Sequence, residues 1–443
     1  EALQAPDPYV VRGAVTHRFL TDCAQQPVDA NNTCTVTATP ISDAVTFAAA
    51  GETVNIEGGD YHETVTIQKA LTLSNAGGGD VNVDAFDLWA DIVIVGNIFS
   101  TNITVHPGAL IGDAVTLVNP TAGGTVNVAA GTYNEGVNLT PGEDVTFVGE
   151  GRDTTIWNCP AGDACIEGNM QGYAGDMNYE ISGFTFNVRS NPATTWAAGI
   201  QIIRASNGPL QLSIHDSKFV EDRASGDNGH WGTSMFLCHN RSASRDAAGN
   251  APVNIFNNID ETWGGVTMSN SQAYNIYSNT FDGASDAIYN GHGCPDSQGN
   301  TFGDHHIYDN TFMNASDALH PNGLTPAIDW QYYGAGLGTH LPSTIENNSF
   351  ENNDTAIRFV FDSNMAYPAT TVSNNRFENN GTAIIVGGAS ATVLNAENNW
   401  WGAADGPSGA GPGSGDAVSA NVDFDPWLTA HPNAPPPPPP APG

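Results

Sequence analysis

The sequence predicts an all-β fold, a parallel β-helix with inserted loops, and two observations support this. A phrase recurs with one apolar register in residues 275–288, 306–319, 344–357 and 371–384. Its apolar residues are Ile, Val and Phe in short alternating runs between Asn, Gly, Asp and Ser, which is typical of strands and turns rather than helices. A unit that cannot bury its own apolar face must stack on its copies, so the repeat indicates a solenoid.

The spacing of the repeat suits one coil of such a solenoid. In each copy an aliphatic residue is followed five positions later by Phe. Looser copies upstream add aliphatic anchors at positions 181, 214 and 255, and the closest anchors, Ile255 and Ile276, are 21 residues apart. Longer separations are expected where a loop is inserted into the same coil.

Two columns of identical residues are expected to run along the coils and to be structural. Asn stands two positions before Phe in every copy. Asn tolerates the left-handed backbone of a sharp turn, and Asn side chains stacked ~4.8 Å apart hydrogen-bond along the column, while the Phe rings stack inside the coil. The columns are Asn279, Asn310, Asn348 and Asn375, and Phe281, Phe312, Phe350 and Phe377.

The first half of the chain contains a longer duplication. Residues 44–47 (AVTF) and 53–67 are echoed by residues 114–117 (AVTL) and 125–139, an offset of about 70 residues or about three coils. The second block, continued to residue 156, resembles the opening coils of right-handed β-helix proteins of the pectin-lyase-like superfamily, including pectin methylesterases. Residues 398–402 (NNWWG), 406–407 and 422–428 resemble the closing segment of bacterial secreted β-helix repeat proteins.

The resemblance implies a fold and not an activity, because that superfamily contains lyases, hydrolases, esterases, epimerases and surface proteins. The catalytic motifs of its pectin methylesterases, polygalacturonases, pectate lyases and alginate epimerases have no complete counterpart in this chain. No catalytic residue is therefore carried over from it.

The expected organisation has three parts. Residues 1–43 form an N-terminal extension or cap, residues 44–428 the β-helix, and residues 429–443 a proline-rich tail. Six consecutive prolines in the tail indicate a polyproline II segment. Both ends are candidates for self-association, and the residues singled out are Tyr9, Val10, Val11, Pro435 and Pro440.

The net charge of the chain limits the classes of partner and substrate that it can bind. The chain of 443 residues has 47 acidic and 12 basic residues, a net charge of -35. Such a charge repels nucleic acid and anionic membranes, and it disfavours cleavage of polyuronates or sulfated glycans, which needs cationic subsites. No apolar run reaches the ~18 residues of a membrane span. We expect an extracellular or cell-surface protein.

Six cysteines indicate disulfide staples, as expected outside the cytosol. Cys23 with Cys34 and Cys159 with Cys165 are close in sequence, and this leaves Cys238 and Cys294 to pair across coils. Other pairings and free buried thiols are the alternatives.

Candidate chemistry lies in the insertions. Asp286 and Asp317 occupy one position in successive repeats, so adjacent coils would place the two carboxylates ~5 Å apart. Such a pair suits a retaining glycosidase or a shared calcium ion, with His320 as a further catalytic candidate; no cofactor is required. The alternative is that each Asp caps a turn. Other groups expected to gather on this side are His292, His305, His306, Asp329, Trp330, Tyr332, Tyr333 and His340.

The sequence therefore favours an extracellular structural protein, a filament or surface-layer subunit joined through its terminal segments or coil ends. The alternative is a secreted carbohydrate-active enzyme, or a module that binds cell-surface glycan, acting on neutral polysaccharide near Asp286 and Asp317. A passive adhesin or spacer is the third reading.

Overall fold

The computed structural model describes residues 8–24, 30–170, 173, 175–189, 196–204, 210–222, 231–239, 245–269, 273–291, 300–316, 326–332, 338–361, 370–388 and 393–432. In these ranges the chain is almost entirely β-strand and divides into two compact units. Unit 1 comprises Glu1–Asn158 and Met177–Thr185, and unit 2 comprises Cys159–Asp176 and Phe186–Gly443. Neither the boundary of the predicted extension nor that of the tail is tested by this division.

Unit 1 begins with three short strands: β1 (Tyr9–Arg12), β2 (Val15–Leu20) and β3 (Asn32–Val36). β1 pairs antiparallel with β2 and with β4 (Thr53–Ile67), and β2 pairs parallel with β3. Val10 is fully buried, whereas Val11 is 49% exposed. The apolar run predicted as an extra strand or cap thus forms a hairpin on the first coil.

The coils of unit 1 stack through parallel strands. β4 pairs with β5 (Leu71–Leu88), and β5 pairs with β6, β7 and β8 of the next coil. β8 pairs with β9, which pairs with β12, which pairs with β15; β10 pairs with β13. The bounds are β6 Ile92–Val95, β7 Ile98–Ser100, β8 Asn102–Val105, β9 Gly124–Val128, β10 Gly131–Asn134, β11 Val137–Asn138, β12 Val145–Gly149, β13 Thr155–Asn158 and β15 Met177–Ser182.

The duplicated block of unit 1 contains a short helix in each copy, which the strand pattern did not indicate. The AVTF and AVTL echoes fall on α1 (Pro40–Phe47) and at α2 (Ile111–Thr116). In each copy one glutamate, Glu63 being buried and Glu135 half-buried, accepts hydrogen bonds from two backbone N–H groups of the first turn: Glu63 at 2.9 and 2.9 Å, and Glu135 at 2.8 and 3.0 Å. A carboxylate supplies acceptors for N–H groups that have no partner within the helix, so Glu63 and Glu135 act as caps.

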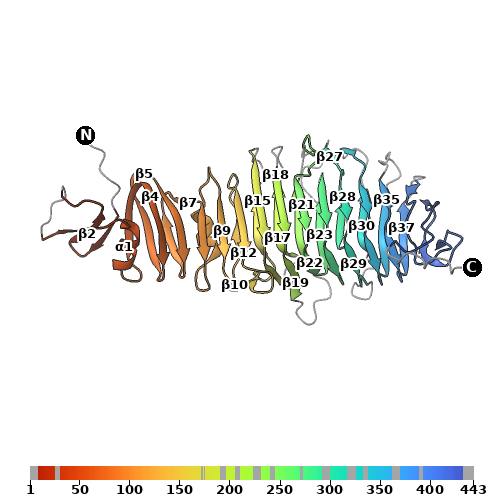
Figure 1. Cartoon of the computed structure of the whole chain (residues 1–443), viewed down its shortest axis with the longest axis horizontal. Coiled ribbons are helices and arrows are strands. Elements are labelled where there is room, and N and C mark those ends of the chain that lie inside the picture. The colour runs from red at the N-terminus through yellow and green to blue at the C-terminus, as the bar shows by residue number, and fades with distance from the viewer. Residues whose placement is uncertain are drawn as a thin grey trace, which may run out of the picture. The chain divides into compact units, whose positions relative to one another are not determined.

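Unit 2 is built from three parallel sheets that the chain visits in turn in each coil (Figure 1). The first sheet contains β18 Leu210–His215, β21 Val253–Phe256, β24 Tyr274–Tyr277, β28 His306–Tyr308, β32 Thr344–Glu346, β35 Thr371–Ser373, β38 Leu394–Asn395 and β41 Val422–Asp423. The second contains β19 Lys218–Asp222, β22 Ile259–Glu261, β25 Thr280–Asp282, β29 Thr311–Met313, β33 Ser349–Glu351 and β36 Arg376–Glu378.

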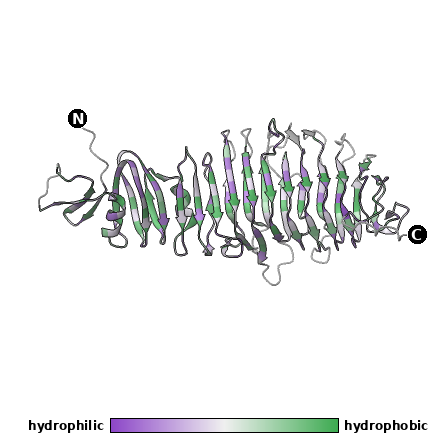
Figure 2. Ribbon diagram, viewed as in Figure 1, coloured by the Kyte–Doolittle hydropathy of each residue, from purple (hydrophilic) through white to green (hydrophobic). Residues whose placement is uncertain are grey.

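The third sheet contains β14 Ala164–Asn169, β17 Trp196–Arg204, β20 Trp231–His239, β23 Gly264–Ser269, β26 Ile288–Gly291, β30 Pro326–Tyr332, β34 Thr355–Phe361, β37 Thr382–Gly388, β40 Gly415–Val418 and β39 Pro407–Gly409. β16 (Thr185–Arg189) lies at the division between the units, and β27 (Asn300–Phe302) pairs with β31 (Gly338–His340) outside the three sheets. The predicted parallel β-helix is confirmed by this arrangement. Figure 2 shows the alternation of apolar and polar residues along its strands.

The Asn column forms a continuous hydrogen-bonded ladder in the core of unit 2. The Oδ1 atom of Asn348 accepts bonds from the backbone N–H and the Nδ2 of Asn310, both at 3.0 Å. The same pair of contacts repeats along the column and extends it by Asn258 at one end and Asn399 at the other. Each buried amide thus satisfies a backbone group of the neighbouring coil, which a buried polar group requires.

The left-handed backbone does not lie on the ladder asparagines, and that prediction was wrong. It lies on the residue before each of them: Ser278, Asp309, Asn347 and Asn374, with φ between 55° and 57°. The turn residue is exposed, and the ladder residue after it points inward. The sequence pattern assigned both the left-handed turn and the ladder contact to one Asn, whereas the structure divides these two roles between neighbouring residues.

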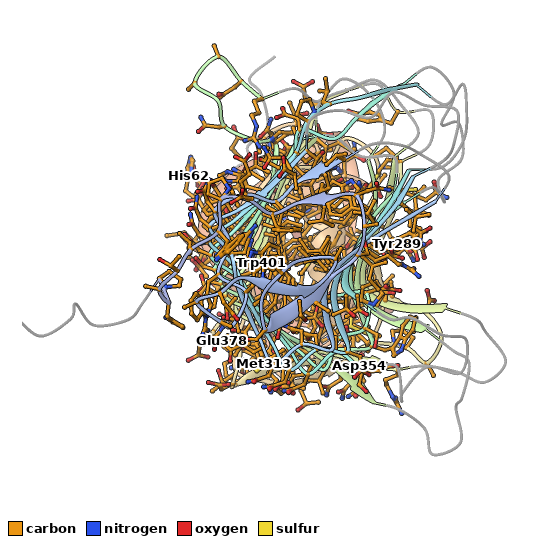
Figure 3. The ribbon with its side chains drawn as sticks, turned by 90° about the vertical axis from the view of Figure 1, so that its right-hand side faces the viewer. His62, Tyr289, Met313, Asp354, Glu378 and Trp401 are labelled. Atoms are coloured by element: carbon orange, nitrogen blue, oxygen red, sulfur yellow. A yellow bond between two sulfur atoms is a disulfide. The ribbon has the colours of Figure 1, made fainter. Side chains whose placement is uncertain are left out.

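The Phe column lies inside the coil. Successive ring centroids from Phe281 to Phe377 are 4.9 to 5.0 Å apart, and Trp401 continues the stack at 4.9 Å. Figure 3 shows Trp401 in the interior of the coil. Asp260 interrupts the column, since it pairs in register with Phe219 and Phe281 and is 1% exposed. Burial raises the pKa of Asp260 to about 6.

Candidate functional site

A cluster of charged and polar side chains lies on the outer face of the third sheet of unit 2. Tyr289, Asp329 and Arg358 occupy one row across β26, β30 and β34, because each follows an inward Ile in register. Residues next to each other in such a row are one strand spacing apart, about 4.8 Å. The row therefore brings together three functional groups that are far apart in the sequence.

Asp329 is the centre of this cluster. It is 1% exposed, and its Oδ1 accepts a hydrogen bond of 2.9 Å from the Nε of Arg358. Its Oδ2 is contacted by Arg358 and by the side-chain amide of Gln331, whose Oε1 accepts a bond of 3.3 Å from the Tyr289 hydroxyl. A buried carboxylate needs such partners, and Arg358 gives Asp329 a charge-assisted one.

Asp286 lies just before β26 and joins the cluster electrostatically. Its φ of 55° is left-handed, and its N–H donates to the Pro326 carbonyl at 2.8 Å. The Oδ1 atom is buried and has no hydrogen-bond partner among the described residues. Burial, and then the charge of Asp329, raise the pKa of Asp286 to about 8, although Arg358 lowers it. Asp286 is therefore a neutral acid at pH 7.

The structure changes the predicted composition of this site. Asp317 and His320 lie outside the described residues, and the carboxylate that acts on Asp286 is Asp329. Of the other groups predicted to gather on this side, Asp329 lies in the cluster, whereas His305, His306 and Trp330 do not. His305 and Trp330 are buried in the core with their rings 5.7 Å apart, and His306 lies on the first sheet. His292, Tyr333 and the side chains of Tyr332 and His340 are outside the described residues.

The chemistry of the cluster is limited by burial. A neutral acid beside an ionised carboxylate is the combination that glycosidases use. Here the second carboxylate, Asp329, is almost fully buried and already bonded to Arg358 and Gln331. In the described part of the chain, no group of three or more His, Cys, Asp or Glu side chains is placed to hold a metal ion. The half-buried groups beside the pair, Tyr289 and Gln331, are suited to binding.

A second candidate site is the outer edge of β3 in unit 1. Among the described residues, β3 pairs with β2 and with no other strand. The Asn31 carbonyl accepts from Thr16 and the Thr37 N–H donates to Leu20, so odd-numbered residues carry this ladder. The backbone groups of Cys34 and Val36 therefore face the outer edge of the strand, and Val36 is 67% exposed. An edge of this kind accepts another strand.

The residues that the sequence singled out for self-association do not lie on β3. Tyr9 and Val10 pair with β4, so they hold the extension to the coil instead of facing a neighbour. Val11 is exposed on β1, and Pro435 and Pro440 lie outside the described residues. The free edge belongs to β3, which the sequence did not single out although Thr35 and Val36 are strong strand formers.

Two predicted disulfides are confirmed. Cys23–Cys34 ties β3 to the segment that precedes it, with Cα atoms 6.0 Å apart, and Cys159–Cys165 closes a loop with Cα atoms 4.4 Å apart. Cys238 is also disulfide-bonded, whereas Cys294, its predicted partner, is outside the described residues.

Comparison with family models, curated proteins and solved structures finds no match for this chain. Among the described residues, the helices are too short to cross a membrane.

Proposed function

We propose that this chain is an extracellular structural protein that self-associates through the free edge of β3. The observation that carries the proposal is the outward direction of the backbone groups of Cys34 and Val36. Two disulfides and a further disulfide-bonded cysteine, Cys238, are typical of proteins outside the cytosol, and they support the location.

The composition of β3 supports this use of its edge. Monomeric sheet proteins protect edges with charged residues, proline or bulges. β3 has the sequence Asn-Thr-Cys-Thr-Val, with no charge and no proline. The terminal strand of unit 2 differs, because β41 contains Asp423 and is soon followed by Asp425 and Pro426. The unprotected edge is thus the N-terminal one.

Descent from the pectin-lyase-like superfamily is part of the same proposal. The parallel coils and the duplicated opening block support it. In this reading a scaffold shared with enzymes serves here as a structural subunit, since fold alone does not fix function.

The edge is tested by placing a charge on it. Val36→Lys introduces a lysine at the outward position, and we expect it to abolish the high-mass species that the unmodified protein forms. Because a net charge of -35 opposes association, those species should grow as salt is raised. Light scattering between low and high ionic strength measures both effects.

The matched control is Val93→Lys, at a valine of β6 that is 58% exposed on another part of unit 1. It should assemble like the unmodified protein. A strictly monomeric protein at every salt concentration, or equal assembly by both lysine variants, would refute the use of this edge.

A second candidate function is binding of neutral glycan on the third sheet, favoured by the bonded pair Tyr289 and Gln331 above Asp329. We expect Tyr289→Ala to weaken binding to a panel of neutral glycans at least about fivefold, the value of a lost anchor of ~1 kcal/mol. Met313→Ala, an outward residue of the second sheet, is the control; Figure 3 shows both residues at the rim. Absence of binding to every glycan would exclude this function.

A further inference from the structure

A second aromatic column runs along the outside of unit 2, on the first sheet. His215, Phe256, Tyr277 and Tyr308 are in register on β18, β21, β24 and β28. Their ring centroids are 4.6, 5.0 and 4.9 Å apart, with interplanar angles of 8°, 8° and 5°. Four rings in register span three strand spacings, about 14 Å. Neither the Asn ladder nor the β3 edge uses this ridge.

The stacking decides which part of each ring meets a ligand. All four residues are half-buried, and the faces of the inner rings are covered by their neighbours. Burial also raises the pKa values of Tyr277 and Tyr308, so both phenols stay neutral. A sugar that stacks on an open ring face has little to contact here. The ring edges, which carry the positive end of the quadrupole, favour the face of another planar π-system.

Carboxylates flank the ridge. Asp309 follows Tyr308 and is exposed in the left-handed turn, and Glu346 occupies the next position of the row. Asp216 lies 2.7 Å from the His215 ring. Of the basic groups described on this face, Arg245 is paired with Asp304 at 3.2 Å, and the His306 ring contacts Glu346 at 2.8 Å, which leaves Asp309 as the open carboxylate beside Tyr308. A positively charged ligand is therefore favoured over a neutral or anionic one.

We propose that this ridge is a binding site for elongated, planar aromatic cations, which lie along the solenoid with a face against the ring edges and their charge near Asp309 and Glu346. The length of the ridge, its apolar ring edges and its acidic border each restrict the ligand. The occupant is a small molecule about three strand spacings long.

The test uses thioflavin T, a planar aromatic cation, with protein shown to be monomeric by light scattering so that assembly contributes nothing. We expect saturable fluorescence enhancement that weakens as salt is added. Tyr277→Ser breaks the middle of the ridge and should lower the affinity at least tenfold. Asp309→Asn keeps a residue that tolerates the left-handed turn and should lower the affinity several-fold through lost charge alone.

Asp153→Asn is the matched control, because it removes one exposed carboxylate from unit 1 and should leave the affinity unchanged. Circular dichroism of each variant checks the fold. The site is refuted if the unmodified protein gives no saturable enhancement, or if Tyr277→Ser and Asp309→Asn both bind the dye as the control does.

Discussion

Asn348→Ala is expected to lower the free energy of unfolding by about 4 kcal/mol or more, because it opens the ladder at its centre. The Oδ1 of Asn348 accepts two bonds from Asn310, and its Nδ2 donates to the carbonyls of Ile307 and Glu346. Alanine leaves all of these buried or partly buried groups without their partner. Denaturant unfolding followed by circular dichroism measures the change.

The neighbouring residue supplies the control. Asn347 is exposed with a φ of 57°, a conformation that glycine also adopts, so Asn347→Gly should change stability by less than ~0.5 kcal/mol. If the two variants unfold at the same denaturant concentration, the ladder contributes no more than the turn beside it.

Asp286→Asn is expected to remove a large pH dependence of stability. The pKa of Asp286 is raised from 3.8 to about 8 in the folded protein, chiefly by burial. Its folded form therefore holds the proton more tightly, and the stabilisation present below the unfolded pKa is lost as pH rises through about 8. Over that window the loss is on the order of 5 kcal/mol. The amide has no proton to lose, so the variant should be the more stable protein at pH 9.

Asp309→Asn makes the same chemical change at the same φ of 55°, but at an exposed position. Its unfolding midpoint should follow that of the unmodified protein from pH 5 to pH 9. If the stability of the Asp286 and Asp309 variants depends on pH in the same way, ionisation of Asp286 does not destabilise the folded protein, and the prediction is wrong.

The columns of unit 2 were predictable because one residue type recurs at one position. Strand spacing then places identical side chains in contact, as Phe312 and Phe350 show. The extension of the columns by Asn258 and Trp401 was missed, because their flanking residues depart from the repeated phrase. At these two positions, membership of a column depends on strand register and not on a match to the repeated phrase.

The carboxylate site was only half predictable. Asp286 stood out in the repeat, whereas Asp329 lies beyond a long insertion and joins it through strand register. A signal was present, since Tyr289, Asp329 and Arg358 each directly follow an inward Ile. The helices were missed for a different reason. Each is short, and the glutamate that caps it lies further along the chain, Glu63 within β4 and Glu135 between β10 and β11.

The association of copies through β3 is tested most directly by amide hydrogen exchange in the peptide that contains Asn32–Val36. If a second strand covers this edge, the outward N–H groups of Cys34 and Val36 gain partners, and their exchange should slow as protein and salt concentrations rise. Exchange across β6 should stay constant. Unchanged exchange in the β3 peptide, under conditions where the protein has a high mass, would contradict assembly through this edge.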